Sequence, residues 1–211
     1  TSLIKNVVLP NFITKHEKSF VFFADLMEVK SQESIDQRIS RGFEIAFSQS
    51  FPAKNFIEGV KRFLGSFRPQ VSLDPNTGAP AISMTSQSQD KKVSCEEIFK
   101  TIMDIAKERD TIIVLDEFQD IAFIDEAQGL FRRIFQEIKK IPIIVMGSKR
   151  HILADIFAKP NAPLSMFGED VEFKPISYDE YHEYIVERFQ SEGLNMSLDD
   201  SKYLQDTVLR I

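Results

Sequence analysis

Two adjacent acidic residues, Asp116 and Glu117, directly follow a predicted strand, and this arrangement could support hydrolysis of a nucleotide. The strand, Thr111–Leu115, reads TIIVL, so carboxylates buried at its end would be costly without a cation or hydrogen bonds. In such a site the first acid can hold the hydration shell of Mg²⁺, and the second can orient and deprotonate the attacking water. The alternative interpretation is that both acids only cap and solvate a strand–helix loop.

The rest of the chain predicts the frame that would position these acids. Three largely continuous apolar runs and one further short segment are predicted strands, and they alternate with segments whose apolar residues recur at helical spacing. Continuous apolar runs are typical of a mostly parallel sheet with helices on both faces, so we predict an α/β fold. The predicted strands are Ser19–Leu26, Thr111–Leu115, Pro142–Met146 and Val171–Ile176, and the predicted helices are 2–8, 34–47, 53–67, 125–140, 149–157 and one that opens at Ser94.

Ligands of open parallel sheets bind beyond the carboxyl ends of the strands, so the polar residues that follow each strand are the candidates. Ser148 follows the third predicted strand after Gly147, and Asp25 lies at the tip of the first. Asp25 is either a polar rim residue of the same cleft or a loop-capping acid, and the sequence favours neither.

A β-hairpin and a helical end complete the organisation. In residues 69–84, apolar Val71 and Leu73 alternate with polar residues, and the turn-forming sequence DPNTG follows at 74–78. A short second strand is predicted at 81–84, so this segment is predicted to be a β-hairpin inserted between helices. Ser177 and Glu180 form a capping box, and the chain beyond them is predicted to be helical only. We therefore predict an α/β core over residues 1–176 and the start of a helical lid over residues 177–211.

Composition excludes several classes of protein. The chain has 211 residues, of which 43% are hydrophobic and 27% charged, so it is predicted to be globular rather than disordered. The net charge of −6 argues against a protein that mainly coats nucleic acid, although it does not exclude a local basic face that binds it. The single cysteine, Cys95, excludes an intrachain disulfide and suits the cytoplasm. No apolar run approaches the length of a membrane helix, so we expect no membrane association.

The run Ile112–Asp120, IIVLDEFQD, resembles the Walker B strand of P-loop ATPases, in the LDEFQ form of the archaeal-type ATPase family. That family is an AAA-like or signal-transducing (STAND) branch of the P-loop NTPases. The resemblance implies that Asp116 serves Mg²⁺ and Glu117 is the catalytic base. It also implies that Ser148 is the sensor 1 residue, and that the hairpin at 69–84 is the insertion carried by the family. ATP and Mg²⁺ are the expected cofactors.

The first residues resemble the family's helix after its phosphate loop, whose motif is G-x-x-x-x-G-K-[ST]. By this resemblance Thr1 is the hydroxyl residue that ligates Mg²⁺, and Ser2 lies beside it in the nucleotide site. The glycines, the lysine and the strand that precede Thr1 in the family are not in this chain, so we expect a chain truncated after the lysine. We also expect open edges on the strands 142–146 and 171–176, which would flank the missing strand.

Other candidate residues have simpler interpretations. Lys149-Arg150-His151 follows Ser148, and an arginine there could reach a γ-phosphate, but surface charge is the favoured interpretation. The three histidines are scattered, so no metal site beyond Mg²⁺ is predicted. Cys95 lies beside a helix start, which can lower a thiol pKa, yet no partner is indicated and an ordinary side chain is expected.

Two functions are compatible with these patterns. The first is an ATPase module that couples nucleotide state to the helical lid and so to a protein partner or oligomer. The second is a nucleotide-independent module, derived from an ATPase, that binds protein or DNA. The residues upstream of Thr1 separate the two, because only an ATPase needs G-x-x-x-x-G-K there. A third class, an α/β-hydrolase-fold enzyme or a dehydrogenase, lacks support, since neither G-x-S-x-G nor G-x-G-x-x-G occurs.

This chain alone should bind ATP poorly and be inactive, because the phosphate loop supplies most contacts to the β- and γ-phosphates. We expect ATP with Mg²⁺ to raise its melting temperature by no more than about 1–2 °C in a thermal-shift assay. A clear, saturable shift would contradict this prediction.

Overall fold

The central strand of the larger unit, β4 (Asp110–Asp116), is buried along almost its whole length. A computed structural model describes residues 1–51, 53–65, 67–73, 78, 80–85, 93–171 and 177–208. Strand β4 pairs in parallel with β1 (Ser19–Asp25) on one side and with β5 (Ile143–Val145) on the other. The order β1-β4-β5 confirms the predicted α/β fold with a parallel sheet.

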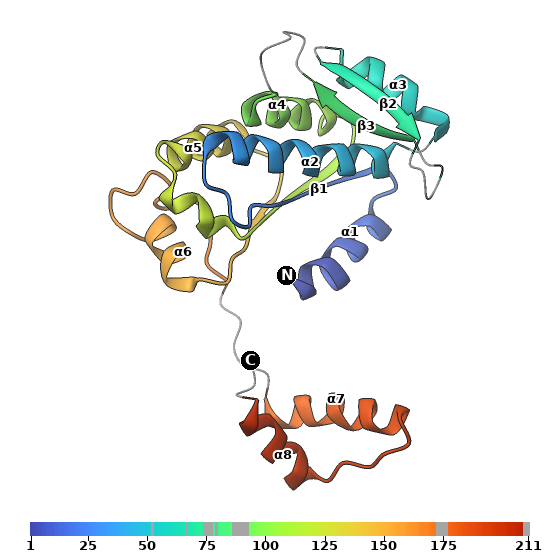
Figure 1. Ribbon diagram of the computed structural model, residues 1–211, viewed down its shortest axis with the longest axis vertical. Coiled ribbons are helices and arrows are strands. Elements are labelled where there is room, and N and C mark those ends of the chain that lie inside the picture. The colour runs from blue at the N-terminus through green and yellow to red at the C-terminus, as the bar shows by residue number, and fades with distance from the viewer. Residues whose placement is uncertain are drawn as a thin grey trace. The chain divides into compact units, whose positions relative to one another are not determined.

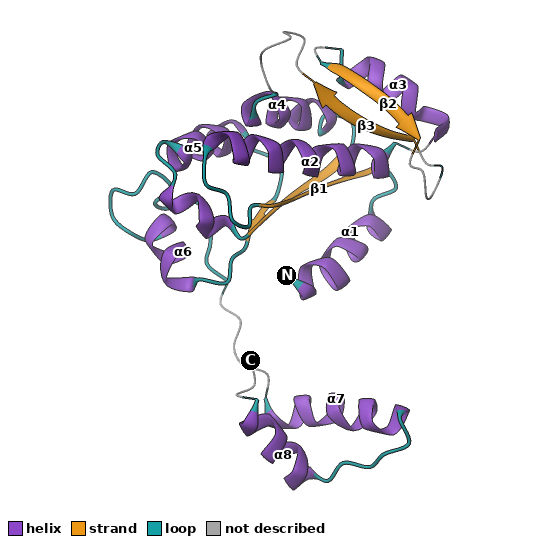
Figure 2. Ribbon diagram, in the orientation of Figure 1, coloured by secondary structure: helices purple, strands orange, loops and turns teal. Residues whose placement is uncertain are grey.

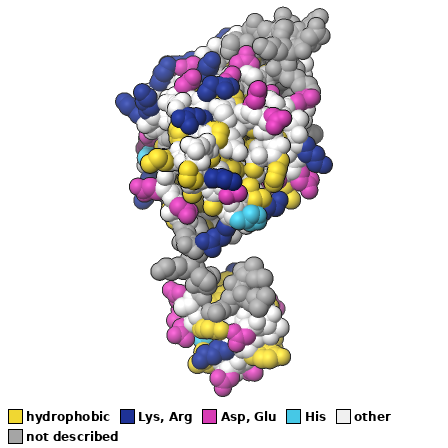
Figure 3. All heavy atoms as spheres, turned by 90° about the vertical axis from the view of Figure 1, so that its left-hand side faces the viewer, with side chains coloured by type: hydrophobic (Ala, Val, Ile, Leu, Met, Phe, Trp, Pro, Cys, Tyr) yellow, Lys and Arg dark blue, Asp and Glu magenta, His cyan; other side chains and the backbone are white. Residues whose placement is uncertain are grey.

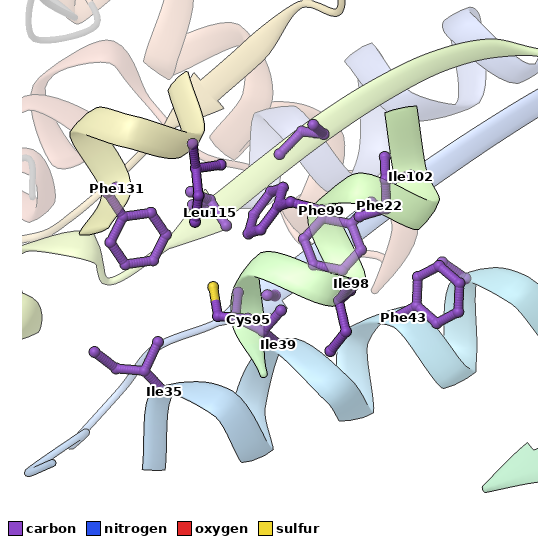
Figure 4. Packing of buried hydrophobic residues seen from close by; sticks show 14 of the residues in the cluster. Phe22, Ile35, Ile39, Phe43, Cys95, Ile98, Phe99, Ile102, Leu115 and Phe131 are labelled. Carbon is purple, nitrogen blue, oxygen red and sulfur yellow. The ribbon is translucent and has the colours of Figure 1, made fainter. Parts of the chain in front are cut away.

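One face of this sheet carries the main hydrophobic core. Helices α2 (Gln32–Ser50), α4 (Cys95–Ile105) and α5 (Ala127–Glu137) supply its apolar stripes, in which phenylalanine rings pack edge to face. Figure 4 shows Phe22 and Leu115 of the strands meeting side chains of α2 and α4. Three-residue and four-residue spacing of apolar side chains along each helix explains why these faces are buried together.

The opposite face is covered by the N-terminal helix (Figure 1). A π-helical turn, Ile4–Val8, continues directly into α1 (Leu9–Lys15), so the predicted helix 2–8 is too short. Pro10 cannot donate an intrahelical hydrogen bond, and the wider π turn accommodates its ring. In this helical segment Leu9 is buried against Ile112 and Val114 of β4, whereas Leu3 and Val7 are exposed.

The predicted hairpin is confirmed as an antiparallel pair. It consists of β2 (Arg68–Leu73) and β3 (Pro80–Thr85), after helix α3 (Ala53–Phe63), and Val71 pairs with Ile82. Figure 2 shows this pair as a separate sheet that does not join the parallel one. Residues 74–77 of the predicted turn lie outside the described residues.

The remaining elements follow the predicted order. After β4 comes a 3₁₀ segment, Phe118–Phe123, which the sequence patterns did not predict, and β5 is followed by α6 (Arg150–Phe157). The predicted strand 171–176 lies almost wholly outside the described residues. Helices α7 (Tyr178–Ser191) and α8 (Leu198–Thr207) complete the chain, and the Ser177 capping box that opens α7 is confirmed.

The chain divides into two compact units, Thr1–Phe167 and Gly168–Ile211. The α7–α8 unit is stabilised by Gln205, which is fully buried and donates to the carbonyl oxygen of Tyr178 and to Ser201. The predicted boundary after residue 176 falls within residues that are not described and stays a prediction. Among the described residues, no helix has the length and apolar character that crossing a membrane requires.

Helix α2 approaches β1 closely at Gly42, where a Cβ atom would lie 2.6 Å from the carbonyl oxygen of Phe23. We expect Gly42→Ala to lower the free energy of unfolding by about 1–3 kcal/mol, because backbone must move. The matched control is Gly129→Ala in α5, where the added methyl group would have no neighbouring atom within 4 Å. That change should raise stability by about 0.5–1 kcal/mol through helix propensity. Urea denaturation measures both, and a stabilising Gly42→Ala would contradict the packing.

Candidate functional site

The candidate site lies where the three parallel strands end. Asp116 is the last residue of β4, its register partner is Asp25 of β1, and its side chain is only 4% exposed. Backbone hydrogen bonds hold the loops after the strands to β4: Leu26 N–H donates to the Asp116 carbonyl at 3.0 Å, and Met146 N–H to that of Leu115 at 2.8 Å. The loops after β1, β4 and β5 are therefore fixed beside one another.

Thr1 and Asp116, 115 positions apart in the chain, are in direct contact. The Thr1 hydroxyl lies 3.1 Å from Oδ1 and 3.0 Å from Oδ2 of Asp116. Oδ1 also accepts the backbone N–H of Glu117 at 3.1 Å, which helps to compensate the buried charge. The structure thus brings together the two residues that the family resemblance assigns to Mg²⁺, whose role there stays a prediction.

The chemistry of this pair fits Mg²⁺ bound to a nucleotide. Magnesium takes oxygen ligands at about 2.0–2.1 Å in an octahedron, so neighbouring ligand oxygens lie about 3 Å apart. The Thr1 and Asp116 oxygens have that separation. Among the described residues no group of three or more His, Cys, Asp or Glu side chains could hold a metal. Two ligand oxygens from the protein would leave the other positions of an octahedral ion to phosphate and water.

Glu117 stands on a sharp turn directly after β4. Its backbone is in the left-handed region, with φ 50° and ψ 38°, which is uncommon for a residue other than glycine. Its carboxylate oxygen Oε2 accepts the Ser148 hydroxyl at 3.1 Å and Gln119 Nε2 at 2.5 Å. The turn separates the Glu117 side chain from the Asp116 side chain and places Glu117 beside the loop after β5.

Asp120 connects all three loops, and the sequence patterns did not single it out. Its carboxylate accepts the backbone N–H of Glu28 at 2.7 Å and Gln119 Nε2 at 3.2 Å, and it forms an ion pair with Lys149 at 3.5 Å. The signal that could have found it is the cluster of polar residues at the end of β4, where Asp116, Glu117, Gln119 and Asp120 follow one another with only Phe118 between them. Lys149 is thereby tied to Asp120, on the edge of the site.

Other predicted residues are placed differently. Ser2 accepts a hydrogen bond from Asn6 at 3.0 Å within its own helix, so its contribution to nucleotide binding stays a prediction. Asp25 accepts the backbone N–H of Met27 at 2.9 Å, the geometry of a loop-capping acid. Cys95 is buried at the start of α4, where burial, with Asp36 and Glu96 adding to it, raises the pKa of its thiol. It therefore stays a neutral core side chain.

A groove of about 350 Å³ between α1 and α2 is a separate feature. Its lining is mostly apolar, with Leu9, Val21, Phe23 and Ile45, and Lys5 is the cation among the described residues that line it. Such a lining does not suit a triphosphate, so the strand ends remain the candidate site.

Comparison with known proteins supports the fold. The sequence matches no protein-family model and no curated protein. Among solved structures it is similar to the Walker-type ATPase PABY2304 of Pyrococcus abyssi, with a TM-score of 0.61 and 18% sequence identity. This chain therefore has a fold similar to that of the Pyrococcus Walker-type ATPase. The likeness covers 96% of this chain and 54% of the Pyrococcus chain, so this chain spans about half the length of that protein.

Proposed function

We propose that this chain is the ATP-hydrolysing part of a P-loop ATPase whose phosphate loop precedes Thr1. The observation that carries the proposal is the contact of the Thr1 hydroxyl with both carboxylate oxygens of Asp116, at 3.0 and 3.1 Å. A threonine and a buried acid placed in this way are the protein ligands that a P-loop ATPase offers to Mg²⁺. The fold shared with a Walker-type ATPase supports the same conclusion.

Each residue then has a distinct task. Thr1 and Asp116 would hold Mg²⁺, and Ser2 would lie at the phosphates. When bound, the ion would supply positive charge beside the β- and γ-phosphates. Glu117 orients the attacking water and accepts its proton, and Ser148, as sensor 1, holds the Glu117 carboxylate from the neighbouring loop.

The strand that leads into the phosphate loop would pair with β5. Ile143, Ile144 and Val145 of β5 are only half-buried, although β4 beside them is buried. A further parallel strand along this edge would cover them, as the resemblance implies. Reading the codons upstream of Thr1 tests this step directly, and a gene without G-x-x-x-x-G-K there would contradict it.

The helical unit is the proposed route from nucleotide to partner. We assign residues 1–176 to the core and 177–211 to the start of a lid whose position follows nucleotide state. Residues 177–211 contain 3 Lys and Arg against 8 Asp and Glu, a formal net charge of −5. This charge makes a protein partner or another subunit a better fit than DNA.

A nucleotide-independent interaction module is the second candidate. The observation that favours it is the hairpin, where Leu73 of β2 is 69% exposed and Val71 46% exposed. On one face of the larger unit, Lys and Arg side chains are interspersed with Asp and Glu (Figure 3). On this face the mixture of charges suits a protein partner better than DNA.

The decisive variant is Glu117→Gln in the full-length protein. We expect ATP binding to persist while turnover falls about 10²–10⁴-fold, because glutamine cannot accept the proton of water. The control is Glu126→Gln, which alters another glutamate with positive φ, outside the site. Equilibrium binding of a fluorescent ATP analogue and phosphate release measure the two effects. Unchanged turnover in Glu117→Gln would reject the assignment.

A further inference from the structure

Gln119 is a buried polar side chain to which the proposed mechanism assigns no role. It is 1% exposed and lies in the 3₁₀ segment that follows Glu117. Its Nε2 donates to Oε2 of Glu117 at 2.5 Å and to Oδ1 of Asp120 at 3.2 Å. Both acceptors are carboxylates, so this orientation of the amide is required, since reversal would place its oxygen against two anionic oxygens.

Gly147 provides the space that Gln119 occupies. A Cβ atom at position 147 would lie 1.8 Å from Oε1 of Gln119, so any side chain there would displace the amide. The next residue, Ser148, donates to the same Glu117 oxygen that Gln119 contacts. Gln119 is therefore held between the turn after β4 and the turn after β5.

The cost of this placement indicates a role beyond packing. Oε1 of Gln119 is buried and has no hydrogen-bond partner among the described residues. A buried amide with an unsatisfied oxygen is less favourable than an apolar side chain of the same size. What the amide supplies in return is two donors directed at carboxylates of the site.

We infer that Gln119 is a positioning residue that orients the Glu117 carboxylate for proton abstraction. Together with Ser148 it engages Oε2 and so leaves Oε1 of Glu117 as the oxygen that receives the proton of water. The link to Asp120 fixes the amide in turn, since Asp120 also binds Glu28 N–H and Lys149. This inference rests on the proposed function, in which Glu117 is the base.

The test is Gln119→Met in the full-length protein, which keeps the side-chain length and removes both donors. We expect kcat for ATP to fall about 10-fold or more while KM changes less than about threefold, because substrate binding does not involve Glu117. In a Glu117→Gln background the same change should cause no further loss. The control is Thr101→Val, which removes a buried hydroxyl of α4 outside the site.

The outcomes separate the two claims. A normal kcat in Gln119→Met, with Glu117→Gln inactive, overturns the positioning role and leaves the proposed function intact. Unchanged turnover in Glu117→Gln overturns the proposed function, and the positioning role with it. An equal loss from Gln119→Met in both backgrounds shows general damage to the fold and also overturns the inference.

A second measurement does not depend on a foldable variant at position 119. In the 211-residue chain, the side-chain amide protons of Gln119 should exchange slowly with solvent in NMR spectra. Glu117→Gln should shift these resonances and speed their exchange, because it removes a charged acceptor. Resonances that do not respond to Glu117→Gln would contradict the contact on which the inference rests.

Discussion

The carboxylate of Asp116 is buried at the end of the central strand, and a buried charge must be compensated. Two donors do so here, the Thr1 hydroxyl and the Glu117 N–H. Both need other parts of the fold. Helix α1 must pack on the sheet for Thr1 to reach the acid, and the chain must turn sharply after β4 for Glu117 to leave the strand direction. The hydrogen bonds that compensate the Asp116 charge therefore connect Thr1, at the start of the chain, to the end of β4.

The loops after β1, β4 and β5 form a connected polar frame around that acid. Asp120 accepts from Glu28 and Gln119 and pairs with Lys149, so it holds one residue from each loop. The left-handed backbone of Glu117 is uncommon, and such strain persists only where the surroundings enforce it. The frame supplies that enforcement, because it holds the Glu117 carboxylate through Gln119 and Ser148.

Much of this arrangement was predictable from the sequence. The continuous apolar runs predicted the parallel strands, and the rule on strand ends brought Asp116, Glu117 and Ser148 to one edge. The extent of the first helix was not predictable, because a π-helical segment, Ile4–Val8, continues directly into α1 ahead of Pro10. Nor were Gln119 and Asp120, whose roles depend on contacts with loops some 30 and 90 residues away that local patterns do not encode. The roles of Thr1, Ser2, Asp116, Glu117 and Ser148 in catalysis remain proposals.

The most direct test of the central claim is a crystal structure of the full-length protein with Mg²⁺ and a non-hydrolysable ATP analogue. We predict Mg²⁺ at about 2.0–2.1 Å from the Thr1 hydroxyl oxygen, with Asp116 in its first or second coordination shell and a water between Glu117 and the γ-phosphate. A triphosphate bound away from Thr1 and Asp116, or Mg²⁺ held without either residue, would contradict it.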